Sequence, residues 1–145
     1  MLDFHIARNQ TEKNHAYKIR EQVFVIEQQV SPELERDGLD DSVEYATEHI
    51  VAYHEKRPVG TARILFKDNR AKLGRIAIIK EKRSKGLGTN LMEFLIKYLK
   101  EKKVNEIYMH AQYYLFNFYQ KFGFKQRGNI FYEANIKHIE MFLDF

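Results

Sequence analysis

The sequence predicts an α/β domain whose central sheet has mixed strand direction. Strand-like and helical segments follow one another in the order βαα, then three strands, then αβαββ. The chain has 145 residues, of which 44% are hydrophobic, and it contains no cysteine. A chain of this length buries enough surface for one core that needs neither disulfides nor a structural zinc held by thiolates. We therefore expect one domain over residues 1–145.

The first part of the chain is expected to form a strand and two helices. Residues 2–7 are typical of a short strand. Thr11 with Glu12 offers a helix start, and the apolar side chains that follow recur at helical spacing, which predicts an amphipathic helix. Ser31 and Pro32 are typical of an N-cap followed by proline at the first helical position, so a short second helix is expected there.

Three strands are predicted next. The runs 44–53 and 59–66 are joined by a polar segment at 55–58, which suits a hairpin connection. The run 72–79 ends in four apolar residues, as expected of a strand that is buried on both faces. Gly74 within it indicates a bulge or a close approach of another backbone.

The second half of the chain begins with its most regular helix. From 86 to 100 the apolar side chains step by three and four, which gives the helix a clear core face. A strand over 106–112 and a short aromatic helix near 113–121 follow, and Gly123 is typical of a helix end. Two more strands complete the chain, 124–132 and 137–145.

Charge is segregated along the sequence. Residues 1–55 carry 5 basic and 12 acidic side chains, residues 56–103 carry 15 and 4, and residues 104–145 carry 4 of each. A basic middle favours an anionic partner, such as a nucleic acid, a membrane surface or a phosphorylated small molecule. The acidic segment 33–48 is a candidate for attracting a cation.

A glycine loop lies between the apolar strand and the long helix. Its sequence is Arg83-Ser84-Lys85-Gly86-Leu87-Gly88. Two glycines allow a ligand to approach the backbone, and the free N–H groups of a helix start bind phosphate oxygens. The loop lacks the GxxxxGK[ST] pattern of a Walker A site and the third glycine of a dinucleotide-binding fingerprint. Phosphate binding of another kind is therefore predicted.

The loop resembles the RxxGxG motif of the GNAT superfamily of N-acetyltransferases. Residues 19–28 resemble the first-helix signature of its ElaA-like subgroup, and residues 58–63 resemble the third strand of that subgroup. Residues 110–112 and 118–124 resemble the fifth strand of the family and its FYxxxGF segment. The resemblance covers nearly the whole chain. It implies the GNAT fold, a central mixed and mostly antiparallel twisted sheet of six to seven strands flanked by about four helices.

The resemblance also implies acetyl-CoA as co-substrate and no metal. The backbone of Ile76, Ala77 and Ile78 is expected to pair with the pantetheine arm and to polarise the thioester carbonyl through an N–H group. Gln112 stands seven residues before Tyr119, where many relatives carry an asparagine that touches the cofactor arm. The residues expected to bind the pyrophosphate are Arg83, Ser84, Lys85, Gly86, Leu87, Gly88 and Thr89.

The activity implied is direct transfer of an acetyl group to a primary amine, which is a small molecule or a peptide. Tyr119 matches the tyrosine that commonly protonates the departing thiolate in the family. Glu27, His110 and His138 are the candidates for the base that deprotonates the amine. We expect Glu27 and the acidic segment 33–48 to recruit a cationic amine.

Other functions stay open at this point. A catalytically silent sensor that binds coenzyme A would share the loop, and a nucleic-acid-binding module would use the basic middle, although no nucleic-acid-binding motif is present. The lack of cysteine, of a signal peptide and of an apolar run of about 20 residues favours a cytoplasmic protein without a membrane partner. The apolar tail 139–145 suits either the core or an interface, which leaves a homodimer open.

Overall fold

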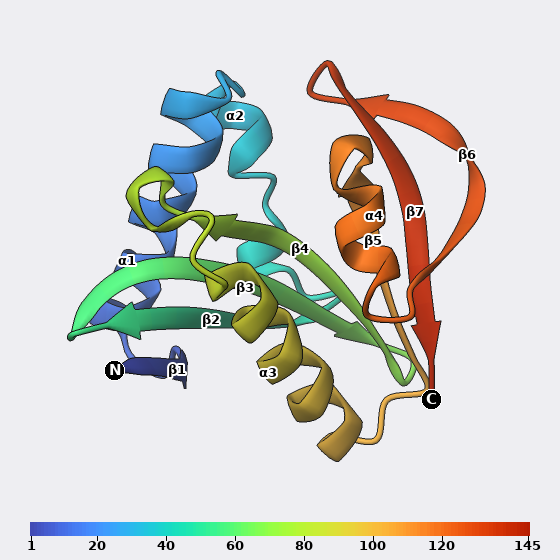
Figure 1. Ribbon diagram of the computed structural model, residues 1–145, viewed down its shortest axis with the longest axis horizontal. Coiled ribbons are helices and arrows are strands. Elements are labelled where there is room, and N and C mark those ends of the chain that lie inside the picture. The colour runs from blue at the N-terminus through green and yellow to red at the C-terminus, as the bar shows by residue number, and fades with distance from the viewer.

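Seven strands form one twisted sheet in the order β1-β2-β3-β4-β5-β7-β6 (Figure 1). The computed structural model describes all 145 residues. The predicted number and order of strands are confirmed, and their limits differ from the expected ones by at most two residues. The strands are β1 Leu2–Ile6, β2 Ala46–His54, β3 Arg57–Lys67, β4 Arg70–Ile78, β5 Glu106–Gln112, β6 Lys125–Glu133 and β7 Ile136–Asp144.

Four α-helices flank the sheet. The first begins one residue before the expected start because the side chain of Asn9, not Thr11, accepts the N–H of Glu12 at 2.8 Å. It continues into a π-helical stretch, Glu21–Glu27. Ser31 caps the second helix, as predicted. The helices are α1 Gln10–Arg20, α2 Pro32–Glu35, α3 Leu87–Glu101 and α4 Phe116–Gln120.

The single parallel pair of the sheet, β4 with β5, is paired over half of its length. Pairing runs from Arg70 opposite Glu106 to Leu73 opposite Met109. Both strands continue beyond that point, β4 to Ile78 and β5 to Gln112, without pairing to each other. The sheet therefore opens between its two central strands, and the edge of β4 beyond Leu73 is available to a ligand.

A bulge in β4 coincides with the end of this pairing. Thr61 faces Ala77 and Arg63 faces Gly74, so two residues of β4 lie opposite one residue of β3. One of them, Arg75, has a φ of 51°. The bulge follows Gly74 directly, as predicted, and a close backbone approach is found instead at Gly60, where a Cβ would lie 3.2 Å from the carbonyl oxygen of Ala77.

Two apolar cores cover opposite faces of the sheet. The larger one packs α3 against the sheet, and the smaller one packs α1 against β2 and β3. Ile76 and Ile78 are only half-buried, which corrects the expectation that the run 72–79 is buried on both faces. Ile139 and Met141 are fully buried, so these tail residues belong to the core. None of the helices has the length and hydropathy needed to cross a membrane.

Candidate functional site

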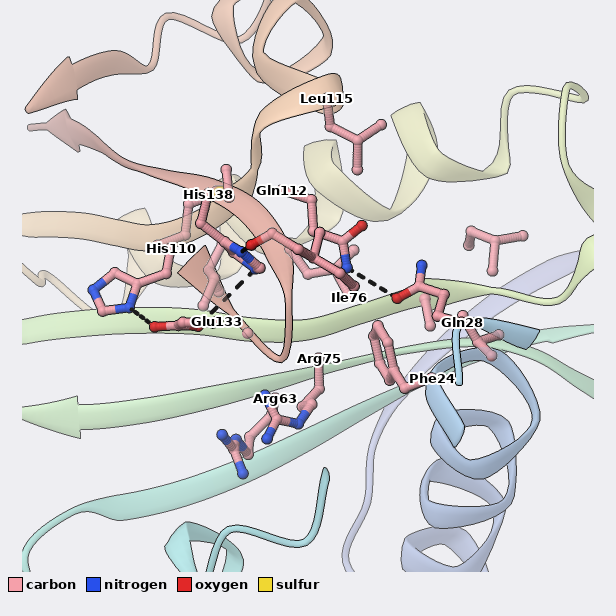
Figure 2. Close-up of a pocket in the computed structure, with 18 of the residues that line it drawn as sticks. Phe24, Gln28, Arg63, Arg75, Ile76, His110, Gln112, Leu115, Glu133 and His138 are labelled. Atoms are coloured by element: carbon pink, nitrogen blue, oxygen red, sulfur yellow. Dashed lines mark hydrogen bonds and ion pairs between the residues drawn. The ribbon is translucent and has the colours of Figure 1, made fainter. Parts of the chain in front are cut away.

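A cavity of about 990 Å³ extends from the opening between β4 and β5. Its wall is built from segments that are distant in the sequence (Figure 2). They are the end of the first helical stretch, the acidic segment after it, β3, β4 with the loop that follows, the start of α3, β5, α4, the turn between β6 and β7, and the start of β7.

The start of α3 lines this cavity, and the backbone N–H groups of its first turn form no hydrogen bond within the helix. Gly86 has a φ of 82° and no side chain caps the helix. The first helical bond runs from the N–H of Asn90 to the carbonyl of Gly86 at 3.0 Å, so the N–H groups of Leu87, Gly88 and Thr89 have no partner in the helix. These N–H groups and the helix dipole together make an anion-binding end.

Arg83 and Glu27, both predicted site residues, bind each other. Nη2 of Arg83 donates to Oε1 of Glu27 at 2.7 Å, and Nη1 donates to the other carboxylate oxygen. Nε of Arg83 donates to the carbonyl of Ile78 at 2.9 Å. The hydrogen bond from Arg83 lowers the pKa of Glu27 below its usual value, which makes Glu27 a weaker base.

The backbone of β4 alternates between its neighbour and the cavity. The N–H of Ile79 donates to Val59 of the preceding strand at 2.9 Å. Because neighbouring residues of a strand direct their backbone groups to opposite sides, Ala77 faces β3 and Ile78 faces away from it. The backbone of Ala77 is therefore engaged in the sheet, contrary to the expectation that all of 76–78 is free for a ligand.

Tyr119 and Gln112 both line the cavity near the opening between β4 and β5. Tyr119, on α4, is 4% exposed, and burial raises the pKa of its hydroxyl above the usual value. Gln112, the last residue of β5, donates its amide Nε2 to Oε1 of Gln28 at 3.0 Å (Figure 2). This bond joins β5 to the end of the first helical stretch.

Two histidines share one carboxylate at the turn between β6 and β7 (Figure 2). Nδ1 of His110 lies 2.9 Å from Oε1 of Glu133, and its Nε2 lies 3.4 Å from Oε1 of Glu140. Nδ1 of His138 lies 2.6 Å from the carbonyl oxygen of Ile136. A carbonyl oxygen only accepts, so Nδ1 of His138 carries the proton and Nε2 of the neutral ring is free to accept one.

Nε2 of His138 also has an anion nearby. It lies 4.0 Å from Oε2 of Glu133, and the His138 side chain is 10% exposed. Glu133 was not predicted from the sequence, because the pairing of β6 with β7 that sets its position beside His138 has no signal in the residues themselves.

The acidic segment 33–48 is largely neutralised inside the protein, which contradicts the expectation that it recruits a cation. Arg20, fully buried, donates to Oε2 of Glu35 at 2.7 Å and to Oδ1 of Asp40 at 2.7 Å. Leaving either carboxylate without its arginine would cost on the order of 3–5 kcal/mol. Arg20 therefore anchors this segment to the first helix.

Two further arginines, both absent from the expected site, complete the network. Arg63 binds both carboxylate oxygens of Asp37 at 2.9 Å. Arg75 donates to Oε2 of Glu35 at 2.9 Å and to Oδ2 of Asp37 at 3.0 Å. The arginines hold the pKa of Asp37 at about 2 despite its partial burial. Arg63 and Arg75 lie side by side on the cavity wall (Figure 2).

Comparison with known proteins agrees with this geometry. Residues 9–145 match the family described as an acetyltransferase (GNAT) domain. The uncharacterized N-acetyltransferase YjcF of Bacillus subtilis (strain 168) is 36% identical over 140 residues, which cover 96% of this chain and 97% of that protein. Protein ElaA of Escherichia coli (strain K12) is 31% identical over 128 residues, which cover 86% of this chain and 82% of that protein.

Two solved structures are similar over nearly their full length. An acyl-CoA N-acyltransferase from Pseudomonas aeruginosa superimposes with a TM-score of 0.87 at 27% identity, covering 98% of this chain and 99% of that chain. Escherichia coli ElaA superimposes with a TM-score of 0.86 at 27% identity, with the same coverage of both chains. The fold described above is the fold of these proteins.

Proposed function

This chain belongs to the GNAT acetyltransferase family, and we propose that it transfers the acetyl group of acetyl-CoA to a primary amine by direct attack in a ternary complex. The observation that carries the proposal is a single cavity with an anion-binding helix start at one end and a buried tyrosine and a histidine–glutamate pair along its wall. The acceptor is a small molecule or a peptide, and residues 1–145 act as one catalytic domain.

The start of α3 is assigned to the pyrophosphate of acetyl-CoA. The free N–H groups of Leu87, Gly88 and Thr89 support this, since they can donate to phosphate oxygens without giving up an existing bond. The exposed side chains of Ser84 and Lys85 stand at the same loop. Gly86 leaves open space where a Cβ would project.

The edge of β4 is assigned to the pantetheine arm. Acetyl-CoA supplies a thioester, whose carbonyl oxygen gains negative charge when an amine attacks it. The N–H of Ile78 faces the opening, while its carbonyl accepts from Arg83, and the half-buried side chains of Ile76 and Ile78 supply an apolar wall. A backbone N–H at this edge would stabilise the developing charge.

Tyr119 is assigned as the acid that protonates the departing thiolate. Its hydroxyl is protonated at neutral pH, and it lines the cavity beside β5; burial raises its pKa, so the assignment is supported by its position and not by its acidity. The reaction needs no nucleophile from the protein, because the amine attacks the thioester directly.

His138 is assigned as the base, in preference to His110 and Glu27. Both ring nitrogens of His110 lie within 3.4 Å of carboxylate oxygens, and Glu27 is held by Arg83. His138 has a protonated Nδ1 held by a carbonyl and an Nε2 that can take a proton directly or through one water. Glu133, at 4.0 Å, would stabilise the ring once it is charged.

A transfer assay tests the proposal. The protein is incubated with acetyl-CoA and a panel of amines, while free thiol and acetylated amine are measured separately. Release of thiol that depends on the amine, with equal formation of the acetylated product, is expected. Binding of acetyl-CoA without thiol release for any amine would overturn the proposal in favour of a silent coenzyme A sensor.

A further inference from the structure

One cation on the cavity wall has no anionic partner. Lys72, on β4, lines the cavity and forms no ion pair within 4.0 Å, although its side chain is partly buried. It lies opposite Leu65 of β3 and Tyr108 of β5 in the sheet. Burial lowers the pKa of its ammonium group, because charge is costly away from water.

The charges around Lys72 do not neutralise it. The three arginines of the neighbouring network, Arg20, Arg63 and Arg75, are matched by the three carboxylates Glu35, Asp37 and Asp40. Of the charges around Lys72, Glu133 and Asp37 favour its ammonium form, whereas Arg63 and Arg75 disfavour it, and neither carboxylate lies within 4.0 Å of the ammonium group.

Arg63, beside Lys72, has an unsatisfied donor of its own. Its side chain is 4% exposed, yet its Nε has no hydrogen-bond partner. A buried donor without a partner is costly. This end of the cavity therefore has one ammonium group without an ion pair within 4.0 Å, beside a buried guanidinium whose Nε has no hydrogen bond.

We propose that Lys72, beside Arg63 and Arg75, binds a carboxylate of the acceptor, so that the substrate has an amine at one end and a carboxylate at the other. This inference rests on the proposed function and names the substrate class of the same cavity. A carboxylate of the acceptor would form the ion pair that the ammonium group of Lys72 lacks. A linear diamine would instead place a second cation beside Lys72.

The sheet register sets the distance between the two ends of the acceptor. His138 lies opposite Gln112 at the end of β5, whereas Lys72 lies opposite Tyr108. Tyr108 and Gln112 are four residues apart, which is about 13 Å along the strand, and β4 and β7 lie on opposite sides of β5, which adds about 10 Å across the sheet. The lysine side chain spans part of this length, so the amine and the carboxylate are several bonds apart. An ω-amino acid fits this spacing and a free α-amino acid does not.

Calorimetric titration of the protein saturated with coenzyme A tests the inference. The probes are 5-aminopentanoate, pentylamine, which lacks the carboxylate, and glycine, which is too short. We expect 5-aminopentanoate to bind at least about tenfold more tightly than either, equivalent to about 1.4 kcal/mol. The preference over pentylamine should vanish in Lys72→Met and remain in Lys97→Met, an exposed lysine of α3.

The outcomes separate this inference from the proposed function. Equal affinity for 5-aminopentanoate and pentylamine, no binding of either, or a preference that survives in Lys72→Met would overturn the carboxylate site while coenzyme A still binds. Failure of coenzyme A itself to bind would overturn the proposed function, and this inference with it. Lys72→Met is expected to stay folded, since it removes a charge that burial disfavours.

Discussion

Glu27 and Arg83, which are 56 residues apart in the sequence, form a two-armed ion pair at the mouth of the cavity. The pair connects the end of the first helical stretch to the loop that precedes α3. It sets a negative charge beside the loop assigned to a pyrophosphate. Glu27 therefore opposes anion binding and is a poor base at the same time.

Glu27→Gln is expected to tighten acetyl-CoA binding about twofold to fivefold. The substitution removes the repulsion between a partly exposed carboxylate and the pyrophosphate, and an interaction between charges at such a site contributes up to about 1 kcal/mol. Its kcat should stay within about threefold of the wild-type value, whereas loss of a general base costs about 10²–10⁴. Calorimetry and steady-state kinetics check both values, with Glu21→Gln, an exposed glutamate of the same stretch, as control. A kcat that falls a hundredfold would restore Glu27 as the base.

Tyr119→Phe is expected to lower kcat about 100-fold while the Kd for acetyl-CoA stays unchanged, because only the proton for the thiolate is lost. A donor thioester with a more acidic leaving thiol needs less help, so the deficit should shrink with such a donor. Tyr132→Phe, at an exposed tyrosine outside the cavity wall, serves as control. An equal deficit with both donors would argue that Tyr119 only packs.

His138→Gln is expected to lower kcat at neutral pH by about 10²–10⁴ and to leave acetyl-CoA binding intact. His110→Gln should cost less than tenfold, since His110 reaches the reaction only through Glu133. Raising the pH should recover activity in His138→Gln, because more of the amine is then already deprotonated. A larger loss in His110→Gln than in His138→Gln would reverse the two assignments.

Stability should fall on mild acidification because of His49. Burial lowers the pKa of this histidine to about 4, with Arg20 and Arg63 adding to the effect, although Asp40 lies 3.6 Å away. Between about pH 6.5 and 4 the unfolded chain binds a proton that the folded chain refuses, so the free energy of unfolding falls as pH falls. The loss from pH 7 to pH 5 is about 2 kcal/mol.

Thermal unfolding across this pH range measures the effect. In His49→Gln the unfolding temperature should depend less on pH between 7 and 5, whereas His54→Gln, at an exposed histidine, should behave like the wild type. Asp37, with a pKa of about 2, stays ionised throughout. A pH dependence in His49→Gln equal to that of the wild type would contradict this account.

Local signals in the sequence were enough to predict most of the fold. Ser31 and Pro32 predict the start of α2, and the spacing of apolar residues from 86 to 100 predicts α3. Helix capping and helical periodicity both act within one or two turns, so the local sequence is enough to reveal them. The burial of β4 was predicted wrongly. Ile76 and Ile78 line the cavity that opens where β5 stops pairing with β4, and no residue in β4 indicates where that pairing ends.

The part of the candidate site that forms a continuous sequence motif could be predicted. The part that depends on which residues the strand pairing brings together could not. The loop 83–88 carries its own signal, since glycines and cations stand together before a helix. The partners of Asp37 and Asp40 come from β3, β4 and α1, so the sequence shows only an acidic segment and hides its arginines. That Lys72 forms no ion pair can be seen only when the partners of these carboxylates are known from the structure.

The central claim, that the start of α3 binds the pyrophosphate of acetyl-CoA, is tested by the thermal shift that acetyl-CoA produces in the wild type, Gly86→Asn and Gly86→Asp. Both substitutions place a similar side chain at a φ of 82°, a conformation that Asn and Asp tolerate better than most residues, and they differ mainly in charge. At 100 times its Kd a ligand stabilises by about 2.7 kcal/mol. The account predicts a shift of several degrees in the wild type, a smaller one in Gly86→Asn and none in a folded Gly86→Asp. Equal shifts in Gly86→Asn and Gly86→Asp, or no shift in the wild type at millimolar acetyl-CoA, would contradict it.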